Sequence, residues 1–197
     1  MLVTMPAKPI PADIDWQLDV PAQVNRSEWT GRRRAVLLSA APRWYARVAL
    51  PPIRGEDAAL SWRAFVIDLD GVANRFRLIS CERDQIAAGT AVSVLGAGQG
   101  GRELITTGWP PSTLVLRRGQ FVTSGEQLLM LMADVVSDAA GVATIAFKPH
   151  LRFSPADGAP LEVRRPFAVM SMSDPRNGWK VGIGQNYGIA FDCEESF

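Results

Sequence analysis

The sequence predicts a mainly β protein: an antiparallel β-sandwich core with one α-helix and an inserted small β-barrel-like module. Two observations carry this prediction. Short apolar runs separated by Gly, Pro and Asp turns recur at near-regular spacing, most clearly between Gly108 and Val163, and this pattern is typical of antiparallel strands in a barrel or sandwich. A single convincing segment, about residues 56–70, has instead the spacing of an amphipathic helix.

The turn signals divide the chain into three parts. Residues 1–11 contain three prolines and are predicted to form an extended Pro-rich arm, because each proline fixes its own φ and restricts the residue before it. Residues 12–86 together with 165–197 are assigned to the sandwich core, and residues 87–164 to the inserted β module.

Two core elements have a clear period. Residues 44–50 alternate, which predicts a strand with Trp44, Ala46, Val48 and Leu50 on its buried face. In the helix, apolar side chains recur at i, i+3, i+4 and i+7. Glu56 and Asp57 suit its N-terminus and Gly71 its C-terminal end.

The last third repeats the strand pattern. Residues 167–172 and 179–183 are interpreted as a hairpin around a turn that ends at Asn177-Gly178. Residues 187–193 are predicted to form the final strand, and Glu194 and Glu195 an exposed tail.

Composition limits the possible functions. The chain has 197 residues, 47% of them hydrophobic, and a net charge of +1, so a polyanion is not expected as its main partner. No apolar run reaches the ~20 residues that cross a bilayer, and the N-terminus lacks the pattern of a signal peptide. We expect a protein made and folded in the cytoplasm, without membrane insertion. In that compartment Cys81 and Cys193 are expected as free thiols.

The residues that suggest chemistry lack supporting context. Gly96 to Gly101 match G-x-G-x-x-G, but Gly108-Trp-Pro-Pro follows where a dinucleotide site needs a helix. His150 is the single histidine, which excludes a two-histidine metal site. We therefore predict no catalytic, cofactor-binding or metal-binding residues, and no enzyme.

A basic cluster with interleaved aromatic residues is the candidate interaction site. It contains Arg26, Arg32, Arg33, Arg34, Arg43 and Arg47, with Trp29, Trp44 and Tyr45. Three roles fit this composition: a solvated strand edge, a protein–protein interface, and a surface for single-stranded nucleic acid. The near-neutral total charge argues against nucleic-acid specificity.

Several segments carry a resemblance to a known family. They are 25–31 (Asn-Arg-Ser-Glu-Trp-Thr-Gly), 43–52, 62–65 (Trp-Arg-Ala-Phe), 69–78, 108–111 (Gly-Trp-Pro-Pro), 116–119, 128–134 and 187–191. In these segments the chain resembles the tail-tip (baseplate) proteins of long-tailed, siphovirus-type bacteriophages, and most closely the distal tail protein.

The resemblance implies a structural virion protein without catalytic residues. It would form a ring, usually a hexamer, that joins the tail tube to the baseplate hub. Its expected partners are copies of itself, the tail tube protein, the hub and the tape-measure protein. In such a ring Trp29, Arg32, Arg33 and Arg34 are predicted at the subunit interface, and the N-terminal arm on a neighbouring copy.

Two alternatives remain. A β-sandwich with six tryptophans also suits a carbohydrate-binding module for host attachment. A small hydrolase would rest only on His150 and scattered Ser and Asp residues.

Overall fold

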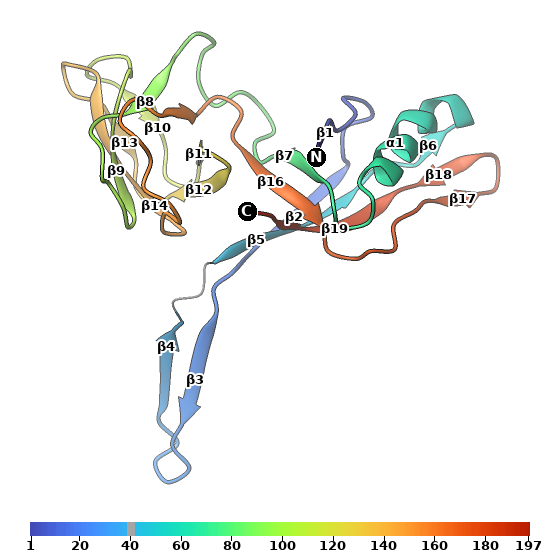
Figure 1. The fold of residues 1–197 in the computed structure, drawn as a ribbon, viewed down its shortest axis with the longest axis horizontal. Coiled ribbons are helices and arrows are strands. Elements are labelled where there is room, and N and C mark those ends of the chain that lie inside the picture. The colour runs from blue at the N-terminus through green and yellow to red at the C-terminus, as the bar shows by residue number, and fades with distance from the viewer. Residues whose placement is uncertain (39–41) are drawn as a thin grey trace.

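Two hydrophobic cores and one projecting hairpin make up the molecule (Figure 1). The computed structural model describes residues 1–38 and 42–197. The first core lies against a six-stranded sheet, and the second fills a closed barrel. The mainly β prediction, with one helix and a barrel module, is confirmed.

The six-stranded sheet brings together strands from both ends of the chain. Its order is β1 (Leu2–Val3), β7 (Arg75–Ile79), β16 (Phe167–Met172), β19 (Ala190–Glu195), β5 (Arg43–Ala49) and β2 (Asp13–Asp19). All neighbours pair antiparallel except β1 with β7. As the alternation predicts, Trp44, Ala46 and Val48 of β5 are buried on one face.

Helix α1 (Glu56–Asp68) packs on that buried face. The ring of Phe65 meets those of Phe76 and Phe191 at centroid distances of 5.4 and 6.3 Å. Beside α1 runs a small sheet of β17 (Lys180–Gly182), β18 (Asn186–Gly188) and β6 (Ile53–Arg54), and Arg63 of the helix lies over the rings of Trp179 and Tyr187. No helix within the described residues has the length and apolar character needed to cross a lipid bilayer.

The barrel is closed because each of its six strands pairs antiparallel with two neighbours. Its order is β11 (Phe121–Ser124), β12 (Gln127–Leu131), β14 (Val142–Lys148), β9 (Glu103–Thr107), β8 (Val92–Val94) and β15 (Pro160–Glu162), which returns to β11. A short ladder of β10 (Leu114–Leu116) and β13 (Val135–Val136) lies beside it. These strands all fall within residues 87–164, the range assigned to the inserted module.

The N-terminal segment is part of the chain's own core rather than a free arm. β1 pairs with β7, and Val3 is buried. The indole N–H of Trp62 on α1 donates to the carbonyl oxygen of Lys8 at 3.1 Å. Within the chain the segment is thus held against β7 and α1, and its packing on a neighbouring copy stays a prediction.

The predicted hairpin over residues 167–183 is wrong. β16 lies between β7 and β19, whereas β17 pairs with β18 in the small sheet. The turn residues up to Gly178 carry the chain from one sheet to the other. The final strand is likewise divided, because β18 and β19 belong to different sheets on either side of Ile189.

Candidate subunit interface

A two-stranded hairpin leaves the body of the molecule between β2 and β5 (Figure 1). It consists of β3 (Ala22–Arg26) and β4 (Arg33–Leu37), paired from Ala22 with Leu37 to Arg26 with Arg33. We call residues 22–37 the projecting hairpin. Five residues at about 3.4 Å each give its ladder a length of about 17 Å.

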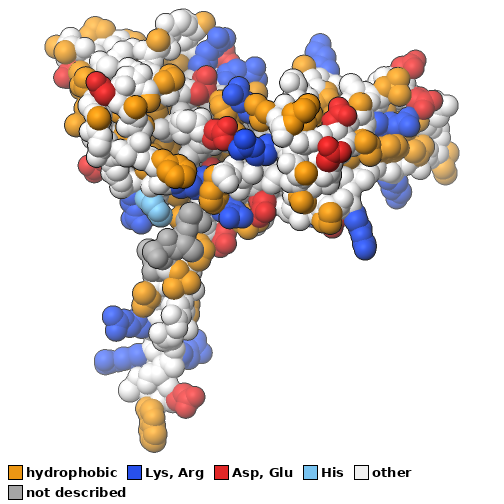
Figure 2. All heavy atoms as spheres, viewed as in Figure 1, with side chains coloured by type: hydrophobic (Ala, Val, Ile, Leu, Met, Phe, Trp, Pro, Cys, Tyr) orange, Lys and Arg blue, Asp and Glu red, His pale blue; other side chains and the backbone are white. Residues whose placement is uncertain are grey.

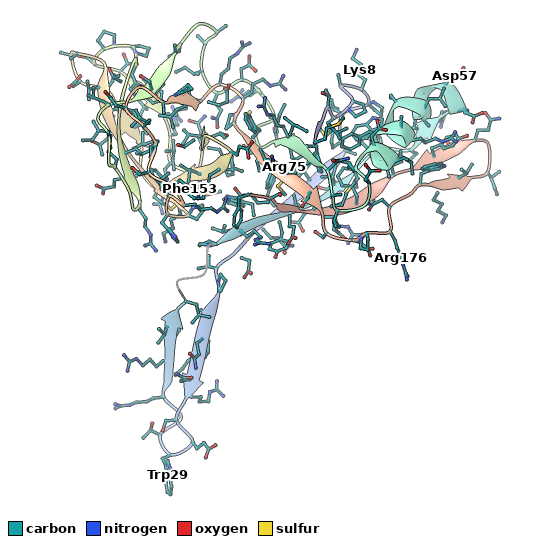
Figure 3. The ribbon with its side chains drawn as sticks, in the orientation of Figure 1. Lys8, Trp29, Asp57, Arg75, Phe153 and Arg176 are labelled. Atoms are coloured by element: carbon teal, nitrogen blue, oxygen red, sulfur yellow. The ribbon has the colours of Figure 1, made fainter. Side chains whose placement is uncertain are left out.

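The loop of the projecting hairpin has an ordered hydrogen-bond pattern. The amide of Ser27 donates to the carbonyl of Arg32 at 3.0 Å, and the amide of Gly31 donates to the carbonyl of Ser27 at 2.9 Å. This turn places Trp29 at the far end, where its side chain is 96% exposed (Figure 3).

Neither face of the projecting hairpin is covered. Every side chain described from residue 22 to 36 is exposed, including the apolar Val24 and Val36 at 48% and 42%. An isolated two-stranded hairpin is marginally stable in water at best. A partner that covers one face would therefore stabilise this element.

The projecting hairpin is also basic. Figure 2 shows Lys and Arg side chains along it, and the sequence identifies them as Arg26, Arg32, Arg33 and Arg34. The register puts Arg26 directly opposite Arg33, and like charges in this position destabilise a strand pair. Among the described residues, none of the four arginines forms an ion pair.

The basic cluster of the sequence is split by the fold. Arg43 and Arg47 lie on β5 in the body, 3.5 Å from Glu194 and 3.9 Å from Asp192. Tyr45 is paired with Glu194 across β5 and β19, and burial together with this carboxylate raises the pKa of Tyr45. Only Arg26, Trp29 and residues 32–34 therefore share the projecting hairpin.

Trp44 has a structural role. Its side chain is buried, and its indole N–H donates to the carbonyl oxygen of Leu128 on β12 at 3.0 Å. It thereby joins the sheet to the barrel.

The described part of the barrel module exposes no tryptophan. Trp109, the barrel module's one tryptophan, is buried, and its indole N–H donates to the hydroxyl of Thr106 at 2.8 Å. Trp44 and Trp62 are buried, and Trp16 and Trp179 are half-buried. Trp29 is the one exposed tryptophan, and it lies at a tip rather than in a cleft.

A second exposed apolar tip was missed by sequence reasoning. Val181 and Ile183, in and just after β17, are 55% and 98% exposed. Gln185 has a φ of 56° and Gly184 one of 73°, which form the turn into β18. The signal was present in the sequence, since Ile183 stands between Gly182 and Gly184.

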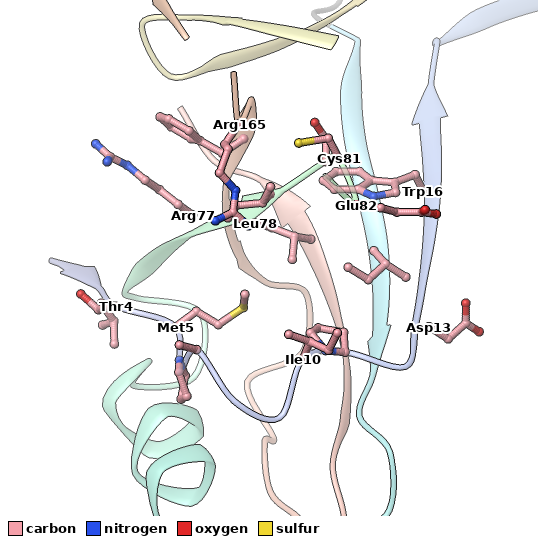
Figure 4. A pocket seen from close by; sticks show the side chains of 18 of the residues that line it. Thr4, Met5, Ile10, Asp13, Trp16, Arg77, Leu78, Cys81, Glu82 and Arg165 are labelled. Carbon is pink, nitrogen blue, oxygen red and sulfur yellow. The ribbon is translucent and has the colours of Figure 1, made fainter. Parts of the chain in front are cut away.

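A groove of about 920 Å³ lies between the N-terminal segment, β2 and the residues that follow β7 (Figure 4). Met5, Ile10 and Trp16 give it apolar walls. Its charged lining residues are Asp13, Arg77, Glu82, Glu162 and Arg165. His150 does not line this groove. Cys81 does, and burial raises the pKa of its thiol.

The other residues singled out for chemistry have structural surroundings. Gly96 to Gly101 lie in the turn between β8 and β9, where the Gln99 side chain bonds the backbone of Leu95 and Ile105. The backbone carbonyl of His150 accepts a hydrogen bond from Gln127 at 2.8 Å. Within the described ranges, no group of three His, Cys, Asp or Glu residues is placed to hold a metal ion.

The exposed tail predicted at Glu194 and Glu195 is wrong, because both residues lie in β19 and pair with β16. Glu194 is half-buried beside Arg43, but the side chain of Glu195 is fully buried and pairs with Arg152. The strand period explains this difference, because the two residues point to opposite faces of β19.

Comparison with models of known protein families gives no match for this sequence. Comparison with curated protein sequences gives none either. The candidate interface consists of Trp29, Arg32, Arg33 and Arg34, which the structure places together on the projecting hairpin.

Proposed function

We propose that this chain is a structural subunit that assembles with copies of itself into a ring, as the distal tail protein does at the tail tip of a long-tailed phage. The observation that carries the proposal is the projecting hairpin, which is exposed on both faces and ends in Trp29. Tryptophan and arginine are enriched among the residues that dominate binding at protein interfaces. In a virion, the ring would join the tail tube to the baseplate hub.

The rest of the fold suits this role. The body is a layered sheet and helix from which the hairpin extends outward (Figure 1). A contact between a protruding hairpin and some other surface of the next copy is heterologous, and heterologous contacts generate rings when the rotation closes. The barrel would then be carried by each subunit as a separate module of the ring.

The proposal is tested by the molar mass of the purified chain, measured by light scattering after size exclusion over a range of concentrations. Six copies of 21.4 kDa give about 128 kDa, and we expect a species near this mass and a ring in electron micrographs. A strictly monomeric chain at every concentration, with no ring visible, would contradict self-assembly.

A deletion variant links the result to the hairpin. Asp19 and Arg43 are paired across β2 and β5, so a short Gly-Ser turn can replace residues 22–37 without disturbing the sheet. We expect this variant to melt like the wild type and to remain a monomer. A deletion variant that still formed the ring would remove the observation on which the proposal rests.

A further inference from the structure

The face of the sheet opposite α1 carries a cluster of carboxylates next to its open edge. β2 ends the strand order, so among the described strands its outer edge has no neighbour. The register places side chains of β2, β5 and β19 on one face in cross-strand rows, such as Asp15 with Arg47 and Asp192. We call its five carboxylates the acidic face: Asp13, Asp15, Asp19, Asp192 and Glu194.

The acidic face and the projecting hairpin are matched in charge. Five carboxylates against Arg43 and Arg47 leave a net charge of −3. On the hairpin, four arginines against Glu28 give a net charge of +3. The chain's total of +1 hides this separation of charge between two surfaces.

The carboxylates are available for new partners. Asp13, Asp15 and Asp19 are all exposed, and within residues 1–38 and 42–197 none of them has an ion-pair partner. Asp192 is 3.9 Å from Arg47 with both side chains about two-thirds exposed or more, and such a surface pair contributes little.

The acidic face is long enough to hold the hairpin. At about 3.4 Å per residue, the seven residues of β2 extend over about 24 Å, against about 17 Å for the five-residue ladder of the hairpin. Within one copy they cannot meet face to face, because the hairpin extends beyond the ends of β2 and β5 and points away from the sheet (Figure 1).

Resting on the ring function proposed above, we infer that the projecting hairpin of one copy lies on the acidic face of a second copy. The carboxylates there compensate the opposed Arg26 and Arg33, whose repulsion would otherwise weaken the hairpin. The contact joins two different surfaces, so each copy can donate its hairpin and accept another, as a closed ring requires.

The test exchanges the charges of the two surfaces. The hairpin variant carries Arg32→Glu and Arg33→Glu, and the face variant carries Asp13→Lys and Asp15→Lys. Glu103→Lys with Asp57→Lys is the matched control, because both carboxylates are exposed and lie outside the acidic face. Melting curves check that every variant is folded.

Assembly is measured by light scattering at low salt and again at 0.5 M NaCl, where charge-driven contacts weaken. We expect the hairpin variant and the face variant to be monomers at tenfold the concentration at which the wild type assembles. The chain with all four changes should assemble again, as should a mixture of the two variants, while the control behaves as the wild type.

The position of the contact is measured separately. A photo-crosslinking amino acid at Trp29 should form intermolecular adducts that mass spectrometry maps to residues 13–19, 43–49 or 190–195. Adducts elsewhere, or a face variant that still assembles, would overturn the acidic face as the acceptor and leave the ring function standing.

Two further outcomes also overturn the inference. A wild type without any oligomer or adduct would remove the ring function along with it. If the wild type instead bound single-stranded DNA through its hairpin and its self-association were unaffected by the face variant, a polyanion would be the partner.

Discussion

The guanidinium of Arg152 and the carboxylate of Glu195 form an ion pair in which the side chains are only 6% and 0% exposed. Glu195 ends β19 in the sheet, and Arg152 follows the barrel strand β14. The carboxylate also accepts the amide of Leu128 on β12 at 3.3 Å and that of Trp44 on β5 at 3.2 Å. This one side chain therefore connects the sheet to the barrel.

Glu195→Gln should lower the free energy of unfolding by about 3–5 kcal/mol, because it leaves the Arg152 cation buried without a counter-charge. The single amide oxygen of the new side chain can accept only one of the two backbone amides, because these contact different oxygens of the wild-type carboxylate. The double variant Arg152→Met with Glu195→Gln should be more stable than Glu195→Gln alone, since it buries no unpaired charge. Urea denaturation followed by tryptophan fluorescence measures both.

An exposed pair provides the control for this prediction. Glu56 and Arg63 of α1 are 2.8 Å apart with side chains 59% and 28% exposed. Glu56→Gln should change the stability by no more than about 1 kcal/mol. Equal losses for Glu56→Gln and Glu195→Gln would show that burial does not set the strength of the Arg152 pair.

Trp29→Ala should abolish assembly while the stability of the subunit stays within about 0.5 kcal/mol of the wild type. The side chain is 96% exposed, so it contributes to no core within the chain, whereas an interface tryptophan is commonly worth 2 kcal/mol or more. Light scattering and thermal melting give the two quantities. Phe153→Ala is the matched control, because Phe153 is 79% exposed but lies on the barrel side (Figure 3). If both variants lost assembly equally, a specific role for Trp29 would be contradicted.

Local sequence patterns predicted two kinds of element. One kind has a regular repeat of apolar residues along its whole length, and the other pairs with a strand that is close in the sequence. The alternation around Trp44 gave β5, and the i, i+3, i+4 spacing gave α1 within two residues at its C-terminus. The turn signals also bracketed the barrel, because its hairpins, such as β11 with β12, are local.

Contacts between segments far apart in the sequence determined the features that the local patterns did not predict. β16 forms five residue pairs with β7, about ninety residues earlier, and this displaces the hairpin that the Asn177-Gly178 turn suggested. Glu195 is buried because Arg152 meets it from the barrel, forty-three residues away. The composition around Trp29 indicated an interface, but its place at a hairpin tip depends on the register of β3 with β4.

Gly108→Ala should destabilise the barrel strongly. Gly108 has a φ of 94°, and a Cβ there would overlap the carbonyl oxygen of Ala91 beside β8. A left-handed conformation costs a residue with a side chain about 1–3 kcal/mol, and the forced backbone shift adds about 1–3 kcal/mol. Gly119→Ala separates the two costs, because its φ is 88° and no atom lies within 4 Å of the added Cβ. Chemical denaturation of the two variants should show a clearly larger loss for Gly108→Ala, and similar losses would mean that the close approach to Ala91 is relieved cheaply.

Cys193 should make stability fall at alkaline pH. Burial, with a smaller effect of Asp192, raises the pKa of its thiol to about 12, against about 8.5 in an unfolded chain. Because the folded pKa is the higher one, the contribution to stability is complete below pH 8.5 and is lost as the pH rises toward 12. In Cys193→Ala this loss is absent, so the stability difference between wild type and variant should shrink by about 1 kcal/mol between pH 9 and 10. Denaturation at a series of pH values measures this stability difference, and Cys81→Ala is the control for a half-buried thiol. If the difference between wild type and Cys193→Ala stayed constant from pH 8 to 10.5, Cys193 would ionise as easily in the folded chain as in the unfolded one.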